Sequence, residues 1–141
     1  MQSIWYRPFT LVDLNRRGEE TLSDFLGIIF TEMTDNSLTA TMPATARTKQ
    51  PIGIVHGGAN VVLAETVAST AANAVIDIDC FYCVGLEIKA NHIRSVREGL
   101  ITGIATPFHI GRSTQVWSIE LYNDAGQRTC VSRMTASVVS R

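Results

Sequence analysis

The segment from Ala59 to Ile76 constrains the fold more than any other part of the sequence. It is rich in alanine, and Glu65 is its single ionisable residue. Several polar residues interrupt it, whereas a membrane span needs about 20 strongly apolar residues. We therefore predict a buried helix over this segment. Small side chains on several of its faces indicate that backbone packs closely around it, as it would if a sheet curved around the helix.

Alternating apolar and polar residues predict strands on both sides of this helix. Consecutive strands joined by short turns, such as the one at Asn123–Gly126, pair in antiparallel sheets. Two short helical segments, 10–15 with Thr10 as its cap and 21–26, precede the first strand. The expected fold class is α+β, with a curved antiparallel sheet wrapped around one long central helix in a single domain over residues 1–141. The predicted strands are 27–33, 37–42, 86–92, 100–108, 114–122 and 128–139.

Composition excludes several classes of partner. The formal net charge is −1 and the pI is about 6.3, so no basic excess favours nucleic acid or an anionic membrane surface. Three cysteines are a poor disulfide framework and fit a reducing compartment. The segment from Met1 to Pro8 lacks the apolar core of a signal peptide. We therefore expect a cytoplasmic protein.

Glu65 is the residue that the predicted helix explains least well. It lies in mid-helix among valine, leucine and alanine, where an ionised carboxylate is costly unless it is hydrogen-bonded or reaches water in a cleft. Burial raises the pKa of a carboxyl group, which suits a base or a nucleophile near neutral pH. The alternative is a structural glutamate that meets a partner across an interface.

The sequence His56-Gly57-Gly58 directly precedes the predicted helix. Glycines at a helix start expose backbone N–H groups, and the helix dipole adds partial positive charge there, so such an end can polarise a carbonyl. Glu65 lies roughly 10 Å further along the helix axis. A carbonyl over the helix start of one chain could thus meet Glu65 of a partner chain. Ser69 shares the face of Glu65. Taken alone, the two glycines are ordinary turn residues, and His56 is more simply structural than a base or a metal ligand.

Other kinds of catalytic site find little support. The three histidines have no ligand spacing such as H-x-x-x-H, so we expect no metal site and no cofactor. Cys80 and Cys83 form an isolated C-x-x-C, whose side chains would point to opposite faces of an extended chain. No G-x-S-x-G elbow supports a serine nucleophile, and no strand-helix-strand unit supports a dinucleotide fingerprint.

Together these residues resemble the hotdog-fold acyl-CoA thioesterases of the 4-hydroxybenzoyl-CoA type, whose catalytic carboxylate lies on the central helix. The pattern is Gln50, then His56-Gly57-Gly58, Glu65 and Ser69 at their spacings in this chain. A longer likeness to the small enterobacterial thioesterases of menaquinone synthesis, which act on 1,4-dihydroxy-2-naphthoyl-CoA, and of enterobactin proofreading covers nearly the whole chain. It includes the segments 4–5, 13–15, 26–28, 87–92 and 109–112.

The resemblance implies a role for each residue of the pattern. Glu65 would be the nucleophile or the general base that activates water, and the Gly57 N–H would polarise the thioester carbonyl. Gln50 would help to position the thioester or the water. His56 would orient the loop and contact the acyl group or thioester. Ser69 would hydrogen-bond near the attacking water or the substrate.

The resemblance also implies further contacts and a partner. The substrate would be an acyl-CoA or acyl-carrier-protein thioester, with an aryl-type acyl group. One site would draw on two protomers of a homo-oligomer, a tetramer built as a dimer of dimers. An enoyl-thioester hydratase and a non-catalytic thioester-binding hotdog protein remain as alternatives. Weaker candidates for contacts with substrate and CoA are His92, Arg94, Gly111, Arg112 and Ser113.

Overall fold

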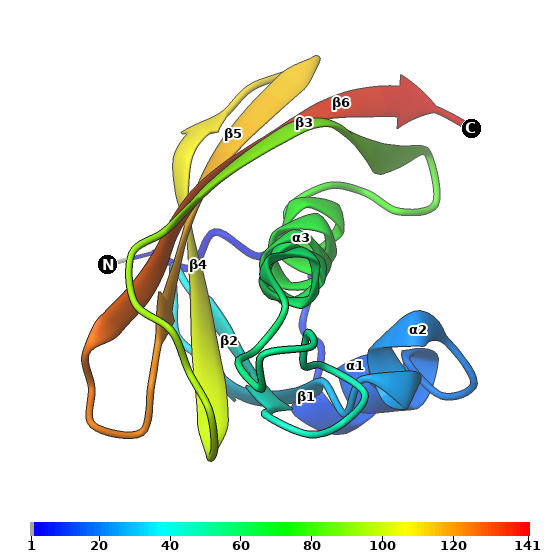
Figure 1. The fold of residues 1–141 in the computed structure, drawn as a ribbon. Helices are drawn as coiled ribbons and strands as arrows, with labels where there is room; N and C mark the ends of the chain where they lie inside the picture. Colours follow the sequence, from blue (N-terminus) through cyan, green and yellow to red (C-terminus); the bar gives the residue numbers. More distant parts are fainter. Residues whose placement is uncertain (1) are drawn as a thin grey trace.

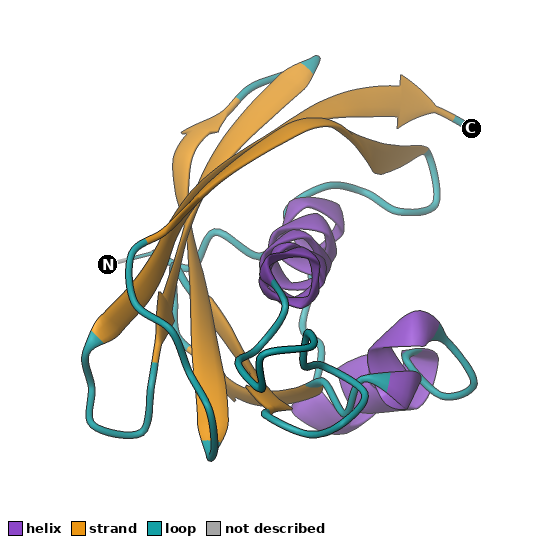
Figure 2. Ribbon diagram, in the orientation of Figure 1, coloured by secondary structure: helices purple, strands orange, loops and turns teal. Residues whose placement is uncertain are grey.

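A six-stranded antiparallel sheet curves around one long helix in the computed structural model, which describes residues 2–141 (Figure 1). The strand order is β1-β2-β4-β5-β6-β3, and the helix α3 lies in the concave face of the sheet (Figure 2). This arrangement confirms the α+β class and the wrapped helix. The elements are α1 (Leu11–Arg17), α2 (Leu22–Phe25), β1 (Ile29–Met33), β2 (Leu38–Pro43), α3 (Gly57–Ala74), β3 (Phe81–His92), β4 (Leu100–Ile110), β5 (Thr114–Tyr122) and β6 (Arg128–Ser140).

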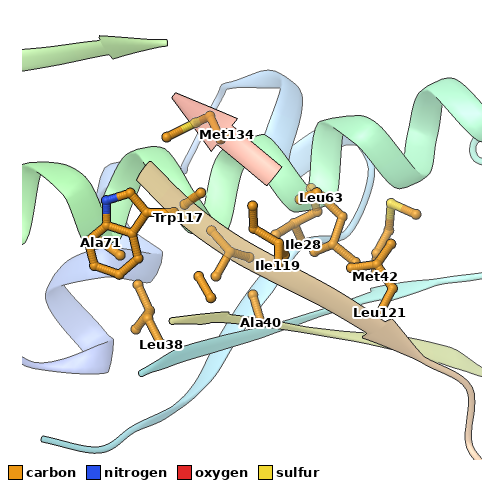
Figure 3. Packing of buried hydrophobic residues seen from close by; sticks show 14 of the residues in the cluster. Ile28, Leu38, Ala40, Met42, Leu63, Ala71, Trp117, Ile119, Leu121 and Met134 are labelled. Carbon is orange, nitrogen blue, oxygen red and sulfur yellow. The ribbon is translucent and has the colours of Figure 1, made fainter. Parts of the chain in front are cut away.

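Close packing of α3 on the sheet follows from its small side chains. Its alanines at 64, 68, 71 and 72 are fully buried together with Leu63 and Val67. On the sheet side, Trp117, Ile119 and Leu121 of β5 are also fully buried and point toward the helix (Figure 3). Burial of such side chains contributes roughly 1.5–3 kcal/mol each, so this layer is the main source of stability. Within residues 2–141, no helix is long and apolar enough to cross a membrane.

The helix α3 begins two residues earlier than its predicted start at Ala59. His56 is the N-cap, and its Nδ1 accepts a hydrogen bond from the Gly58 N–H at 2.8 Å. Gly57 and Gly58 therefore form the first turn of the helix rather than the turn before it. The prediction was wrong here because a histidine side chain supplies the cap that serine, threonine, asparagine or aspartate usually supplies.

Two short helices, α1 and α2, lie near the β1 edge of the sheet (Figure 1). Thr10 caps α1 in a capping box with Asp13, which confirms the predicted cap. Asn15 fastens α1 to β1, because its side chain accepts from the Phe30 N–H and donates to the Phe30 carbonyl. The two elements also line a pocket beside α3.

Strand β3 forms one edge of the sheet and is longer than predicted. It begins at Phe81 rather than Leu86, and a β-bulge between Gly85 and Glu87 interrupts its pairing with β6. The bulge interrupts the alternation of apolar and polar residues, which is the pattern that would have predicted the first half of the strand. Its free edge carries exposed apolar side chains, with Leu86 62% and Val84 42% exposed.

Candidate active site

The N-terminus of α3 presents a free backbone donor. The His56 N–H donates to the Thr48 carbonyl, and the Gly58 N–H donates to the His56 ring. The Gly57 N–H between them meets no acceptor within residues 2–141. Since the first N–H groups of a helix have no intrahelical partner and lie at the positive end of its dipole, Gly57 offers a polarising donor.

A shallow pocket of about 340 Å³ surrounds this donor. It brings together four of the predicted residues, Gln50, Gly57, His92 and Arg94, from the loop before α3, the helix start and the end of β3. The side-chain oxygen of Gln50 accepts from the Ile52 N–H at 2.6 Å. That bond orients the amide through its oxygen, and Gln50 lines the same pocket as Gly57.

Asn60 belongs to this pocket too and was missed in the sequence. It is 6% exposed, and its Nδ2 lies 3.4 Å from His92 Nδ1. The other side of the same imidazole lies beside Gly57, where a Cβ on that glycine would come within 3.0 Å of His92 Nε2. Asn60 is a polar residue among helix positions expected to be buried, and this feature of the sequence could have identified it as a site residue.

Glu65 lies in mid-helix, as predicted, but is only half-buried. Its carboxylate packs on the backbone of β3, because a Cβ added at Gly85 would come within 2.5 Å of Glu65 Oε1. In the described chain, Glu65 takes part in none of the ion pairs. Gly85 thus leaves room for the carboxylate at the bulge. A glycine inside a strand often marks a bulge or a close approach, and this signal was overlooked.

Ser69 lies one turn beyond Glu65 and lines a second pocket, of about 500 Å³, between α1, α2 and α3. The Ser69 hydroxyl donates only to the Met134 sulfur at 3.5 Å, which is a weak acceptor. Apolar walls come from Leu14, Ile28 and Phe30, and a polar stripe on α3 faces them. The members of that stripe are Thr66, Ser69, Thr70 and Asn73.

The Gly57 N–H and the Glu65 carboxylate of one chain do not meet at a common point. Gly57 and Glu65 are separated by about 12 Å along α3 at 1.5 Å per residue, whereas reacting atoms must approach to about 3–3.5 Å. The predicted residues therefore fall into two groups, which we call half-sites. One contains Gly57, Gln50 and His92, and the other contains Glu65 and Ser69.

The predicted residues of the β4–β5 turn lie apart from the half-site at Gly57. Thr114 at the start of β5 pairs with Ser137, which neighbours Val84 near the start of β3, whereas His92 is the last residue of β3. Gly111, Arg112 and Ser113 are thus at the opposite end of the sheet from His92. Arg112 and Ser113 are exposed.

The cysteines do not form a nucleophilic site. Cys80 is exposed while Cys83 and Cys130 are buried, and all three are free thiols. Burial raises the pKa of the Cys83 thiol to about 11, and the Asp77 carboxylate raises the pKa of Cys80, so both remain protonated at neutral pH. In the part of the chain that the structure describes, no three histidine, cysteine or acidic side chains cluster as a metal site would require.

Comparison with known proteins identifies the family to which this chain is similar. The model of the Thioesterase superfamily matches residues 52–130, which include α3 and both glycines at its start. The 1,4-dihydroxy-2-naphthoyl-CoA hydrolase of Escherichia coli K12 is 46% identical over 136 residues, covering 96% of this chain and 99% of that protein. The proofreading thioesterase EntH of Cronobacter sakazakii is 42% identical over 137 residues, covering 96% of this chain and 98% of that protein.

Solved structures give the same result for the fold. The crystal structure of a mutant thioesterase from Pseudomonas aeruginosa superposes with a TM-score of 0.97 at 45% identity, covering 99% of this chain and all of that one. A thioesterase from Haemophilus influenzae superposes with a TM-score of 0.95 at 41% identity, covering 97% of this chain and 95% of that one. These matches confirm that the curved sheet and central helix are the hotdog fold.

Proposed function

This chain belongs to the thioesterase superfamily and is a thioester hydrolase, and we propose that Glu65 of one protomer and the Gly57 N–H of its partner act on the same thioester. The observation that supports this most directly is the free Gly57 N–H at the start of α3. A donor fixed at a helix N-terminus stabilises the oxyanion that forms when a thioester carbonyl is attacked. The enoyl-thioester hydratase and the non-catalytic binding protein gain no support from the thioesterase names of its relatives.

The exposed edge of β3 is the surface on which we place the second protomer. A long free edge with apolar side chains invites pairing with another strand, and Val84 and Leu86 would be buried by it. A twofold axis pairs identical strands antiparallel, so the Phe81 end of one β3 would lie beside the His92 end of the other. That pairing would carry the Gly111–Ser113 turn of one protomer toward the His92 end of its partner. Arg112 could then contact the phosphates of CoA. A dimer of such dimers is the proposed assembly.

Two chemical courses are open to Glu65 in this site. As a general base, it takes a proton from water, the hydroxide attacks the thioester carbon, and the C–S bond breaks as the thiolate takes the proton back. As a nucleophile, it forms a mixed anhydride with release of the thiolate, and water then attacks the Glu65 carbonyl carbon of the anhydride and releases the acyl group as a carboxylate. A single turnover in ¹⁸O-labelled water separates the two, because only the second course puts the label into the Glu65 carboxylate.

The pocket beside Ser69 supports an aryl acyl group as the substrate. Leu14, Ile28 and Phe30 can pack on an aromatic ring, while the hydroxyls of the α3 stripe can bind ring hydroxyl groups. Acyl groups of the 1,4-dihydroxy-2-naphthoyl and hydroxybenzoyl type fit this lining.

The free thiols of all three cysteines support a cytoplasmic location, where thiols stay reduced.

Thiol release from a panel of thioesters tests this proposal. The panel contains hydroxyaryl-CoA, short-chain and long-chain acyl-CoA esters, and the same acyl groups on acyl-carrier protein. We expect kcat/KM for the hydroxyaryl esters to exceed that for straight chains by at least about tenfold, because the pocket combines ring contacts with hydroxyl partners. Equal rates for all acyl groups would contradict the aryl assignment.

Gly85→Ala should reduce activity while leaving the fold intact. The added Cβ would meet the Glu65 carboxylate at 2.5 Å, and that flexible side chain can swing aside. Displacement of a catalytic group by about 1 Å can cost about 100-fold in rate, so we expect kcat to fall on that order. Kinetics and thermal unfolding measured together check this, and an unchanged kcat would show that the carboxylate works from another position.

A further inference from the structure

We infer that Asn60 is a positioning residue that fixes the His92 imidazole with its Nε2–H beside Gly57, so that the site has a side-chain donor next to the backbone one. This inference deepens the proposed function and rests on it. Asn60 is in the first turns of α3 and His92 ends β3, so their contact joins helix and sheet at the edge of the pocket. Neither residue touches the half-site of Glu65 in the same chain.

The hydrogen bond between the two side chains determines which ring nitrogen carries the proton. Asn60 Nδ2 lies 3.4 Å from His92 Nδ1. An amide nitrogen is a donor only, so Nδ1 must accept and the proton of the neutral ring must be on Nε2. If the Asn60 amide were rotated by 180°, its NH₂ group would occupy the buried position of Oδ1. That position has no hydrogen-bond partner among the described residues. A buried N–H group without an acceptor is rarer than a carbonyl without a donor, which favours the orientation observed.

The ring is oriented so that this Nε2–H lies at the Gly57 end of the pocket. A Cβ on Gly57 would come within 3.0 Å of His92 Nε2, so only a glycine lets the imidazole approach this closely. His92 Nε2 therefore lies close to the Gly57 Cα, at the pocket that Gly57, His92 and Gln50 all line. Two adjacent donors stabilise a developing oxyanion better than one, provided that both are held in place before reaction.

Stability alone does not explain an asparagine at this position. The Oδ1 atom of Asn60 is buried and has no hydrogen-bond partner among residues 2–141, and a buried unpaired carbonyl destabilises the folded chain. Asparagine is also a poorer helix former than alanine. An alanine at position 60 would avoid both costs, so what the amide contributes is its hydrogen bond to His92.

Nitrogen-15 NMR of histidine-labelled protein tests the assignment without any measurement of activity. The chain has three histidines, and His→Gln variants assign their signals. In mildly alkaline buffer, where imidazole is neutral, wild-type His92 should show a protonated Nε2 and an unprotonated Nδ1. Asn60→Asp keeps the size of the side chain but can only accept, so it should move the proton to Nδ1. Protonation at Nδ1 in the wild type, or no change in Asn60→Asp, would overturn the inference.

Kinetics then show whether the positioned imidazole serves the reaction. We expect Asn60→Ala to lower kcat about tenfold with KM changed by less than about twofold, and not to lower the thermal midpoint. In a His92→Ala background the same change should have no further effect, because Asn60 acts through that ring. Additive losses, or an unchanged kcat with a lowered midpoint, would show a merely structural role. If no variant and no wild type released thiol, the proposed function would fail while the NMR result still stood.

Discussion

Replacement of Glu65 by alanine should lower kcat by about 10³-fold or more, because a positioned general base contributes about 10²–10⁴-fold to the rate. The fold should persist. The Glu65 carboxylate packs on Gly85 and takes part in none of the ion pairs of residues 2–141, so its removal costs only modest packing. Thiol release and thermal unfolding of the same preparation measure the two effects.

Glu65→Gln is the matched control for this prediction. The amide has the same size and the same place against Gly85, but it can neither take a proton from water nor form an anhydride. Its loss of kcat should therefore equal that of the alanine variant. If the glutamine variant kept activity within about tenfold of wild type, a difference of about 1.4 kcal/mol in barrier, Glu65 would not be the group that activates water.

Gly57→Pro should lower kcat by about 10²–10³-fold, or about 2.7–4 kcal/mol of transition-state stabilisation, because it removes the proposed polarising N–H. The backbone tolerates this change. Gly57 is the first residue of α3, a position at which proline is common, and His56 has φ −63° and ψ 133°, the extended conformation that precedes proline. The substitution thus deletes one donor while leaving the helix start in place.

Gly57→Ala separates the lost donor from the added bulk. Alanine keeps the N–H and, like proline, places a Cβ within 3.0 Å of the position of His92 Nε2. It should lose the part of the activity that depends on the approach of His92, and the proline variant should lose about 10²-fold more. Equal activity of the two variants would mean that the Gly57 N–H does not stabilise the transition state.

Much of the fold could be predicted because local patterns and burial agree in this chain. Residues 114–122 alternate in the sequence, and their side chains are buried alternately in β5. The alanines of α3 predicted a helix enclosed by backbone, and the sheet does curve around it. The predictions were wrong where a single side chain or one extra residue determines where an element begins. The His56 ring starts α3 early, and the bulge beside Gly85 conceals the first half of β3.

The candidate site was predictable only where its residues are close in sequence. The spacing of Gly57 and Glu65 on one helix is fixed by helix geometry, so their separation into two half-sites could be foreseen. The pairing of Asn60 with His92 depends on how the end of β3 meets the start of α3, which no local pattern encodes. The resemblance grouped the Gly111–Ser113 turn with His92 as candidates for contacts with substrate and CoA, and the sheet of one chain places them at opposite ends.

Subunit complementation tests the central claim, that Glu65 of one protomer and Gly57 of its partner form one site. Inactive Glu65→Ala and Gly57→Pro chains are co-expressed, and thiol release is compared with that of each variant alone. A hybrid dimer would contain one site with both residues intact. Random mixing should then restore about one quarter of wild-type activity, since about half of the dimers are hybrids and each has one of its two sites. Activity no higher than that of the separate variants would contradict the shared site and place both residues in sites of single protomers.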